Sequence, residues 1–388
     1  MFETFFKKIG IKKLSFSKKK SNSFLGVDMG SSAIKVVQLK KEKGVAVLET
    51  YGEMALGPMA GVEIGQATNL SDKQISTALI NLVNESKVNV DQCGVSIPVR
   101  SSLVFDMEVP KVIPEQLKKI IPIEARRYIP VPISEVVLDW RIIPKQEFSN
   151  NENDIKDTRP AAKSLNTKTK KPDSLDKLKI FVVAIHKNAM EKYQRIIKNA
   201  KLDLNFLEIE IFSTIRSVVN QNIGTVVILD IGSSVTKAYI VEYGVVKDSH
   251  VINKGSQDIS LAISRAMGIT IEEAEKKKRE IGLNGDGDSI KVSDIVSANL
   301  KYIFIEVNKI MRNYQVKYNK NIGELIFTGG GAVIKGLPAF ASSSLEINSK
   351  VADPFNKIKN PAFLDDVLKE IGPEFAVAVG LALRGLED

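Results

Sequence analysis

The sequence predicts an α/β protein built from two related halves. Its most informative feature is the octapeptide Asp-x-Gly-Ser-Ser-x-x-Lys, which occurs at residues 28–35 and again at 230–237. Each copy follows one apolar, β-prone run and precedes another. The chain has 388 residues, more than one ordinary hydrophobic core accommodates. A repeated motif in a chain of this length predicts two related domains.

Each octapeptide predicts a β-hairpin whose turn is made of glycine and small hydroxyl residues. The glycine lets backbone N–H groups turn toward a phosphate, the serines add donors, and the aspartate can hold a hydrated Mg²⁺. One copy alone would fit an ordinary hairpin turn equally well, and the two matching copies favour phosphate binding. No Gly-x4-Gly-Lys-Ser/Thr loop leads from a strand into a helix, and neither turn contains a Gly-x-Gly-x-x-Gly motif.

The composition excludes several classes of protein. A hydrophobic content of 44% is ordinary for a globular chain. A single cysteine, Cys93, excludes a disulfide scaffold and a Cys-based zinc site. Two histidines far apart in sequence, His186 and His250, argue against a His-rich metal centre. No run of eighteen apolar residues is present, so no membrane-spanning helix is predicted.

The net charge of +9 is concentrated in two segments. Residues 1–20 carry seven lysines against one glutamate, and residues 150–179 carry eight basic against five acidic side chains. The rest of the chain is neutral. A neutral body with two basic appendages argues against a nucleic-acid-binding core, which would carry a basic face on a folded element.

The N-terminal segment, residues 1–22, predicts a short basic amphipathic helix. Phe2, Phe5, Phe6 and Ile9 recur at helical spacing among clustered lysines. Such a helix is typical of a segment that lies on an anionic membrane surface. The alternatives are a helix packed on its own domain and a frayed terminus. A secretory signal is excluded, because lysines interrupt the apolar stretch.

The first half of the chain predicts strands, two helices and a long solvated loop. Ser71 is a suitable N-cap for the first of these helices, and proline at position 114 suits the first turn of the second. The predicted elements are strands at 24–40, 45–56, 94–98, 102–109, 139–143 and 180–185, a helix at 72–88, and a helix beginning at 114. Residues 146–179 are rich in Asn, Lys, Asp, Ser and Thr, which predicts a disordered loop.

The second half predicts a similar alternation of strands and helices. Thr270 opens a capping pattern for one helix, and a long amphipathic stretch predicts another. The predicted elements are helices at 187–200, 212–222, 259–267, 270–280, 292–318 and 374–386, and strands at 205–209, 225–229, 238–241 and 325–327. The last strand ends in Gly329, Gly330 and Gly331, where the lack of Cβ atoms lets a flat ligand or a phosphate approach the backbone.

Two phosphate hairpins followed by a glycine turn resemble the actin-like ATPase superfamily, which includes FtsA and MreB. The resemblance implies an actin-like fold with two related domains around a nucleotide cleft, and ATP and Mg²⁺ as ligands. It places Asp28 and Asp230 on Mg²⁺ through water. It also assigns to the nucleotide Gly30, Ser31, Ser32 and Lys35 from one hairpin, Gly232, Ser233, Ser234 and Thr236 from the other, and the three glycines of the turn.

Residues 274–278 resemble the Ala-Glu-x-x-Lys helix that contacts ribose and adenine in FtsA and MreB. The resemblance implicates Glu275 and Lys278. From spacing alone, this stretch would be interpreted as a solvated charged helix face.

Within the superfamily, residues 25–386 resemble the type IV pilus assembly PilM family most. The resemblance is carried by residues 25–32, 124–130, 138–140, 351–355 and 378–384. The Glu-Ala-x-x-Tyr-Ile-Pro stretch at 124–130 is fairly specific, because FtsA and MreB lack it. The chain departs from the family pattern with Leu207-Glu-Ile-Glu210 and with Ser256. This leaves the water-positioning residue open, with Glu210 as the candidate.

The resemblance also implies a domain organisation, a partner and a location. The predicted ranges are 23–223 for the first actin-like domain, about 110–201 for a subdomain inserted in it, and 224–388 for the second domain. The implied partner is the N-terminal cytoplasmic tail of a PilN-type inner-membrane protein, with Arg126, Arg127 and Tyr128 near its groove. The implied protein is cytoplasmic, peripheral at the inner membrane, and at most a slow ATPase.

Two other functions are compatible with this fold. A small-molecule kinase would need an acceptor site with a catalytic aspartate, and no such signature is evident. A filament-forming, FtsA-like division protein would carry a C-terminal amphipathic membrane helix, which is not expected after the last predicted helix. The pilus interpretation is therefore favoured.

Overall fold

The computed structural model describes residues 22–143, 177–220 and 224–387. The basic segment at 1–20 and most of the predicted loop at 146–179 lie outside the described residues. The chain divides into two compact units. The main unit contains the described residues up to Leu103 and from Ile185 onward, and the small unit contains those from Val104 to Ala184.

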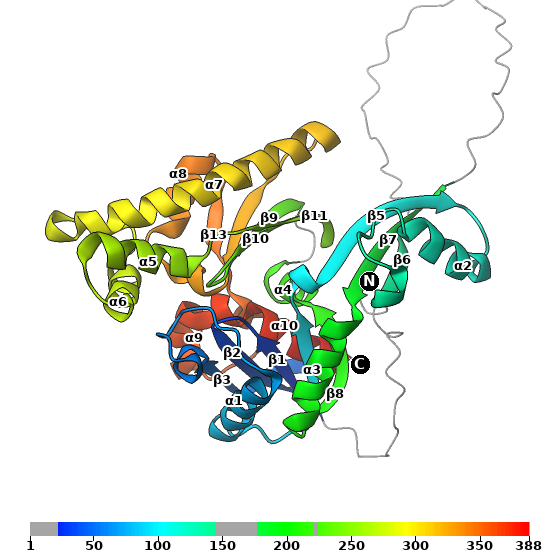
Figure 1. Ribbon diagram of the computed structural model, residues 1–388, viewed down its shortest axis with the longest axis horizontal. Helices are drawn as coiled ribbons and strands as arrows, with labels where there is room; N and C mark the ends of the chain where they lie inside the picture. Colours follow the sequence, from blue (N-terminus) through cyan, green and yellow to red (C-terminus); the bar gives the residue numbers. More distant parts are fainter. Residues whose placement is uncertain (1–21, 144–176, 221–223, 388) are drawn as a thin grey trace, which may run out of the picture. The chain divides into compact units, whose positions relative to one another are not determined.

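The main unit contains two five-stranded sheets with the same topology (Figure 1). In each sheet, three consecutive antiparallel strands are followed by two parallel ones. The first sheet has the order β3-β2-β1-β4-β8, and the second has the order β11-β10-β9-β12-β13. The bounds are β1 Ser23–Met29, β2 Ala33–Glu42, β3 Val45–Ala55, β4 Gln92–Ile97 and β8 Asp203–Ile209, then β9 Thr225–Ile231, β10 Thr236–Glu242, β11 Val245–Ile252, β12 Glu324–Thr328 and β13 Ser349–Val351. This duplication is the actin-like architecture, so the predicted fold class is confirmed.

We call the first sheet and the helices packed with it the first lobe. These helices are α1 (Asp72–Glu85), α3 (Lys187–Asn199), α4 (Glu210–Val218), α9 (Asp365–Ile371) and α10 (Ala376–Glu387). The predicted N-cap of α1 is confirmed. The Ser71 hydroxyl accepts the Gln74 N–H, and the Gln74 side-chain oxygen accepts the Ser71 N–H.

The last helix of the chain, α10, packs in the first lobe. A Cβ atom on Gly26 of β1 would lie 2.0 Å from the Ala378 carbonyl oxygen, and one on Gly380 would lie 1.9 Å from that of Ser213 in α4. Only glycine permits such close approach of a helix to neighbouring backbone. The final residues of the chain therefore complete the core of its first sheet, and the predicted domain boundaries stay predictions.

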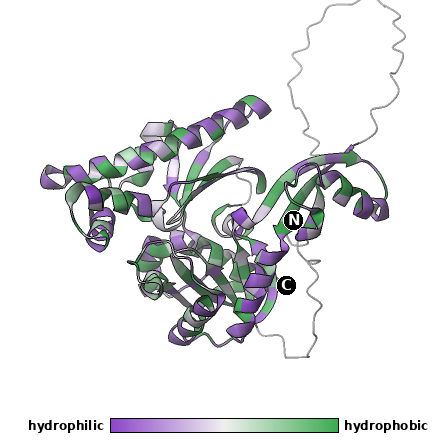
Figure 2. Ribbon diagram, in the orientation of Figure 1, coloured by the Kyte–Doolittle hydropathy of each residue, from purple (hydrophilic) through white to green (hydrophobic). Residues whose placement is uncertain are grey.

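We call the second sheet and its helices the second lobe. These helices are α5 (Ser256–Met267), α6 (Ile271–Ile281), α7 (Ile290–Tyr318) and α8 (Leu337–Leu345). One side of α7 is buried in a cluster with β9, β10 and β12, and Figure 2 shows hydrophobic and hydrophilic residues interspersed along this helix. The predicted capping pattern of α6 is confirmed by reciprocal hydrogen bonds between Thr270 and Glu273.

The small unit has a three-stranded sheet of order β5-β7-β6 and one α-helix. The bounds are β5 Ser102–Pro110, α2 Pro114–Ala125, β6 Val136–Ile143 and β7 Lys177–His186. Strand β7 begins three residues before the predicted position, and in this extension Lys177 and Lys179 pair with Glu108 and Asp106 of the neighbouring strand at 3.2 and 3.0 Å.

Some elements differ from the sequence-based expectation. Helix α4 begins at Glu210 directly after β8 and ends at Val218, whereas the expected range was 212–222. Strands β11 and β13 and helices α8 and α9 were not predicted. The edge strand β11 carries charged and polar residues at its centre, and β13 has only three residues, so neither shows a clear strand pattern. Within the described ranges, no helix combines the length and apolarity needed to cross a bilayer.

Candidate functional site

A cavity of about 610 Å³ lies between the two lobes. It is lined by the turns of both hairpins, the glycine turn after β12 and part of α6. Twelve of the predicted nucleotide-binding residues line it: Asp28, Gly30, Ser31, Ser32, Lys35, Asp230, Gly232, Ser233, Ser234, Glu275, Gly329 and Gly330. The structure thus brings most of the sequence-derived candidates to one place.

The two hairpin turns are structurally equivalent. The Gly30 N–H donates to the Ala33 carbonyl, and the Gly232 N–H donates to the Val235 carbonyl, each at 3.0 Å. The hydroxyl oxygens of Ser31 and Ser233 lie 3.0 Å apart, so the two turns face each other across the cavity. Two sets of hydroxyl and backbone donors therefore converge on a space that an anion can fill.

In the first hairpin, Asp28 and Lys35 are cross-strand neighbours. The Ser96 hydroxyl donates to Asp28 Oδ1 at 2.6 Å, and burial raises the pKa of this carboxyl group. The Lys35 ammonium lies 3.1 Å from a Glu53 oxygen and 3.6 Å from a Glu374 oxygen. Burial disfavours the ammonium charge, but these carboxylates outweigh that effect and raise the pKa of Lys35.

In the second hairpin, Asp230 and Lys237 are the equivalent cross-strand pair. The Lys237 ammonium lies 3.0 Å from Asp230 and 2.6 Å from Glu210. Although burial opposes its charge, these two carboxylates raise the pKa of Lys237 well above its ordinary value. Lys237 lines the cavity, and sequence analysis missed it although it occupies the position of Lys35 in the repeat.

Glu210, the candidate water-positioning residue, also lines the cavity. It is the first residue of α4, and one carboxylate oxygen accepts the Val99 N–H at 2.8 Å while the other binds Lys237. Burial raises the pKa of Glu210. Each oxygen has one partner and can still accept a second hydrogen bond, so Glu210 can orient a water in the cavity while it keeps both contacts.

The glycine turn contacts the second hairpin closely. Gly329 has φ +82°, and a Cβ atom on it would lie 2.3 Å from Asp230 Oδ1. A side chain here would be strained and would displace the aspartate, so glycine is required by both backbone and space. Gly331 faces Ile231 rather than the cavity.

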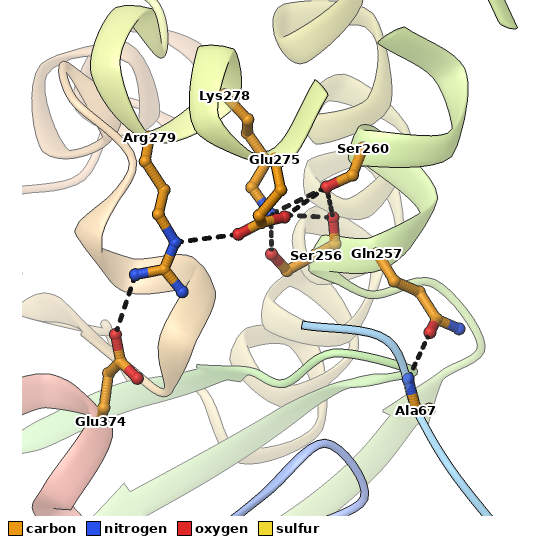
Figure 3. Close-up of polar contacts among 8 residues, drawn as sticks. All are labelled: Ala67, Ser256, Gln257, Ser260, Glu275, Lys278, Arg279 and Glu374. Carbon is orange, nitrogen blue, oxygen red and sulfur yellow. Dashed lines mark hydrogen bonds and ion pairs between the residues drawn. The ribbon is translucent and has the colours of Figure 1, made fainter. Parts of the chain in front are cut away.

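Helix α6 supplies a polar network at the cavity wall (Figure 3). Glu275 accepts from Ser260 at 2.6 Å, Lys278 at 2.5 Å and Arg279 at 2.9 Å. Burial alone would raise the pKa of Glu275, but Lys278 and its other donors hold that pKa below the usual range. The Arg279 guanidinium also lies 3.6 Å from Glu374, which precedes α10 (Figure 3).

Two more predicted residues lie outside the cavity lining. The Lys278 side chain is buried and donates to Ser256 and Ser260, at 2.6 and 3.1 Å. The Thr236 hydroxyl donates to the Lys254 carbonyl at 2.8 Å. Conversely, Arg279 and Glu374 line the cavity and were not predicted. The position of Arg279 depends on which side of α6 faces the cavity, and that of Glu374 depends on where α10 packs.

The donor set suits a hydrated cation better than a directly ligated one. Asp28 and Asp230 both line the cavity, and carboxylate oxygens are the ligands that Mg²⁺ prefers while it keeps several waters. In the described part of the chain, no three His, Cys, Asp or Glu side chains are grouped as a direct metal site. The residues present thus fit Mg²⁺ that is held through water beside a phosphate.

The three candidate partner-binding residues lie in the small unit, directly after α2. All three side chains are exposed; Arg127 pairs with Glu124 at 3.2 Å, and Tyr128 stacks on Phe105 with a centroid distance of 4.8 Å. They form a continuous exposed turn.

Comparison with known proteins is consistent with this architecture. Residues 26–158 and 163–386 match a family described as "Type IV pilus assembly protein PilM". A solved "PilM-PilN type IV pilus biogenesis complex" superimposes with a TM-score of 0.74 at 22% identity, covering 94% of this chain and 98% of that chain. MreB 5 of Spiroplasma citri, solved bound to AMPPNP, gives a TM-score of 0.51 at 12% identity, covering 93% and 95% of the two chains.

A curated relative is the cell division protein FtsA of Bacillus subtilis (strain 168). It is 22% identical over 260 residues, which cover 61% of this chain. The match spans 56% of the length of that relative. At these identities, the solved structures support the fold, and the family match supports membership.

Proposed function

This chain belongs to the type IV pilus assembly protein PilM family, and we propose that it binds ATP with Mg²⁺ between its two hairpins and links this state to a membrane partner. The observation that carries the proposal is the placement of two equivalent hairpin turns on one cavity, with Ser31 and Ser233 hydroxyls 3.0 Å apart. A triphosphate offers an anion to both turns at once.

Each group in the cavity has a role in this proposal. Asp28 and Asp230 would hold the waters of Mg²⁺, and bound Mg²⁺ would neutralise phosphate charge. Lys35 and Lys237 would contact phosphate oxygens as point charges. Glu275 and Arg279 line the part of the wall formed by α6, where the sugar and base of the nucleotide would lie.

Titration of the protein with a fluorescent ATP analogue tests the proposal. We expect saturable binding that is lost when EDTA removes Mg²⁺ and that is competed by unlabelled ATP.

Phosphate release from ATP should be far slower than about 10 s⁻¹, a typical enzyme turnover. The reason is that Glu210 is ion-paired with Lys237 at 2.6 Å, which weakens its carboxylate as a base toward an attacking water. Lack of Mg²⁺-dependent binding, or rapid phosphorylation of a small acceptor, would contradict the proposal.

We further propose that the small unit binds the cytoplasmic N-terminal tail of a PilN-type inner-membrane protein. The support is family membership together with exposed apolar side chains around α2, namely Ile113 (59% exposed), Ile123 (67%) and Tyr128 (49%). Exposed aromatic and aliphatic side chains of this kind commonly anchor peptide partners. Residues 1–20, with their lysines and phenylalanines, would add a contact with anionic lipid at the cytoplasmic face of the inner membrane.

Vesicle co-flotation separates these two contacts. Neutral vesicles that display the tail peptide should retain the full chain, and Tyr128→Ala should weaken retention about tenfold or more, as for other aromatic anchors. Lys118→Ala, an exposed change on α2, is the matched control. Anionic vesicles without the tail should retain the chain at low salt and release it at high salt. If Tyr128→Ala did not change retention on the vesicles that display the peptide, the contact with the tail would be contradicted. If salt did not change retention on the anionic vesicles, the contact with lipid would be contradicted.

A further inference from the structure

An alternating series of charged side chains crosses the cavity from one lobe to the other. Five contacts join successive residues: Glu53–Lys35 at 3.1 Å, Lys35–Glu374 at 3.6 Å, Glu374–Arg279 at 3.6 Å, Arg279–Glu275 at 2.9 Å and Glu275–Lys278 at 2.5 Å. The first three residues belong to the first lobe, and the last three belong to α6 of the second lobe. Figure 3 shows the part of this series around α6.

Glu374 is the central member, because its two oxygens bind cations from different lobes. Oε2 faces Lys35 of the first hairpin, and Oε1 faces Arg279 of α6. Its side chain is only 8% exposed. A carboxylate with so little access to water is costly unless a cation stays beside it.

The backbone around Glu374 is fixed on both sides. Phe375 is buried in one hydrophobic cluster with Val37 and Leu39 of β2, which anchors this segment in the first lobe. The Pro373 carbonyl accepts the Gly329 N–H at 2.9 Å, which ties it to the glycine turn. Glu374 can therefore change its partner by side-chain rotation while its backbone stays in place.

We propose that Glu374 is a positioning residue that couples phosphate occupancy at Lys35 to closure of the two lobes through Arg279. A phosphate beside Lys35 competes with Glu374 for the ammonium group and repels its carboxylate. Glu374 then depends on Arg279 for a counter-charge, which strengthens the contact between the lobes. This inference rests on the proposed function, because it places a polyphosphate at the first hairpin.

A second contact on neighbouring helix α5 would report the same closure. The Ala67 N–H donates to Gln257 Oε1 at 2.9 Å (Figure 3). The next residue, Thr68, donates its own N–H to the Ser31 carbonyl at 2.9 Å. The loop before α1 therefore joins the first hairpin turn to α5. When the two lobes close through the Glu374–Arg279 contact, this loop should become more ordered as well.

Spin-label distance measurements between the lobes test the coupling. Labels are placed at Lys73→Cys on α1 and Lys301→Cys on α7, both exposed positions, and native Cys93 is buried. The probe is Mg²⁺-tripolyphosphate, which has no nucleoside to contact Arg279 directly. Glu374→Gln and Arg279→Gln are compared with Glu280→Gln, an exposed carboxylate that pairs with Lys276 on the same helix at 3.9 Å.

We expect tripolyphosphate to shorten and narrow the distance distribution in the parent double-cysteine protein and in Glu280→Gln. Glu374→Gln and Arg279→Gln should each lose at least half of this change, and their combination should lose no more than either alone. The affinity for tripolyphosphate should fall on the order of threefold in Arg279→Gln, as for a partly exposed ion pair. It should not fall in Glu374→Gln, which also removes the carboxylate that competes with phosphate for Lys35. A full response in Glu374→Gln, or an equal loss in Glu280→Gln, would overturn the coupling.

Measurement without any ligand separates this inference from the proposed function. The ligand-free distribution should be broader in Glu374→Gln and Arg279→Gln than in Glu280→Gln, because the contact between the lobes is lost. Equal ligand-free distributions would overturn the inference even if ATP binds. Failure of the parent protein to bind ATP would instead overturn the proposed function, while a broadened ligand-free distribution would still support the contact.

Discussion

Asp28→Ala and Asp230→Ala are each expected to lower the affinity for Mg²⁺-ATP about 10- to 100-fold, the range for losing one group that supports a bound metal. The two carboxylates come from opposite hairpins and line one cavity. Removing either leaves the hydrated metal supported from one lobe only. Titration with a fluorescent ATP analogue at fixed Mg²⁺ measures the effect.

Asp203→Ala, an exposed aspartate at the start of β8, is the matched control and should bind as the parent does. Mg²⁺-dependent affinity that survives the double variant Asp28→Ala, Asp230→Ala would contradict the assignment.

The pH dependence of binding provides a second check on Asp28. Burial raises the pKa of its carboxyl group, so Asp28 becomes protonated at a higher pH than an ordinary aspartate. Protonation removes the charge that holds the hydrated metal. Affinity should therefore fall as pH decreases toward this raised pKa, and Asp28→Ala should show a weaker dependence over the same range.

Glu208→Ala is expected to have the largest effect on stability, about 3–5 kcal/mol, because it leaves two largely buried arginines without their shared carboxylate. Glu208 is fully buried. It accepts from Arg216 at 2.8 and 2.9 Å, from Arg384 at 2.9 Å and from Ser213 at 2.5 Å. Burial alone would raise its pKa, but the two arginines hold that pKa below the usual range. Urea unfolding followed by circular dichroism measures the loss.

Two further variants decide whether charge is the cause. Glu108→Ala removes a glutamate from an exposed pair with Lys177 and should cost less than about 1 kcal/mol. Combining Glu208→Leu with Arg216→Met and Arg384→Leu should recover much of the stability, because well-packed apolar groups often replace a buried ionic cluster without loss. A cost below about 1 kcal/mol for Glu208→Ala would show that the cluster contributes little.

The sequence by itself determined the features that depend on local interactions. The hairpin turns follow from glycine and serine at fixed spacing, and each closes with a hydrogen bond between residues three apart. The caps at Ser71 and Thr270 likewise join residues within one turn of helix. The repetition of the hairpin motif was enough to indicate two related domains and the residues of both turns that line the cavity.

The tertiary structure alone decided which side chains meet across the cavity. Lys278 and Arg279 are adjacent in sequence, but packing of α6 buries the first among Ser256 and Ser260 and turns the second toward Glu374. Glu374 reaches the site because α10 packs on the first sheet at Gly26 and on α4 at Gly380. Such contacts depend on helix rotation and on the approach of segments far apart in the chain, and local sequence patterns carry no information about either.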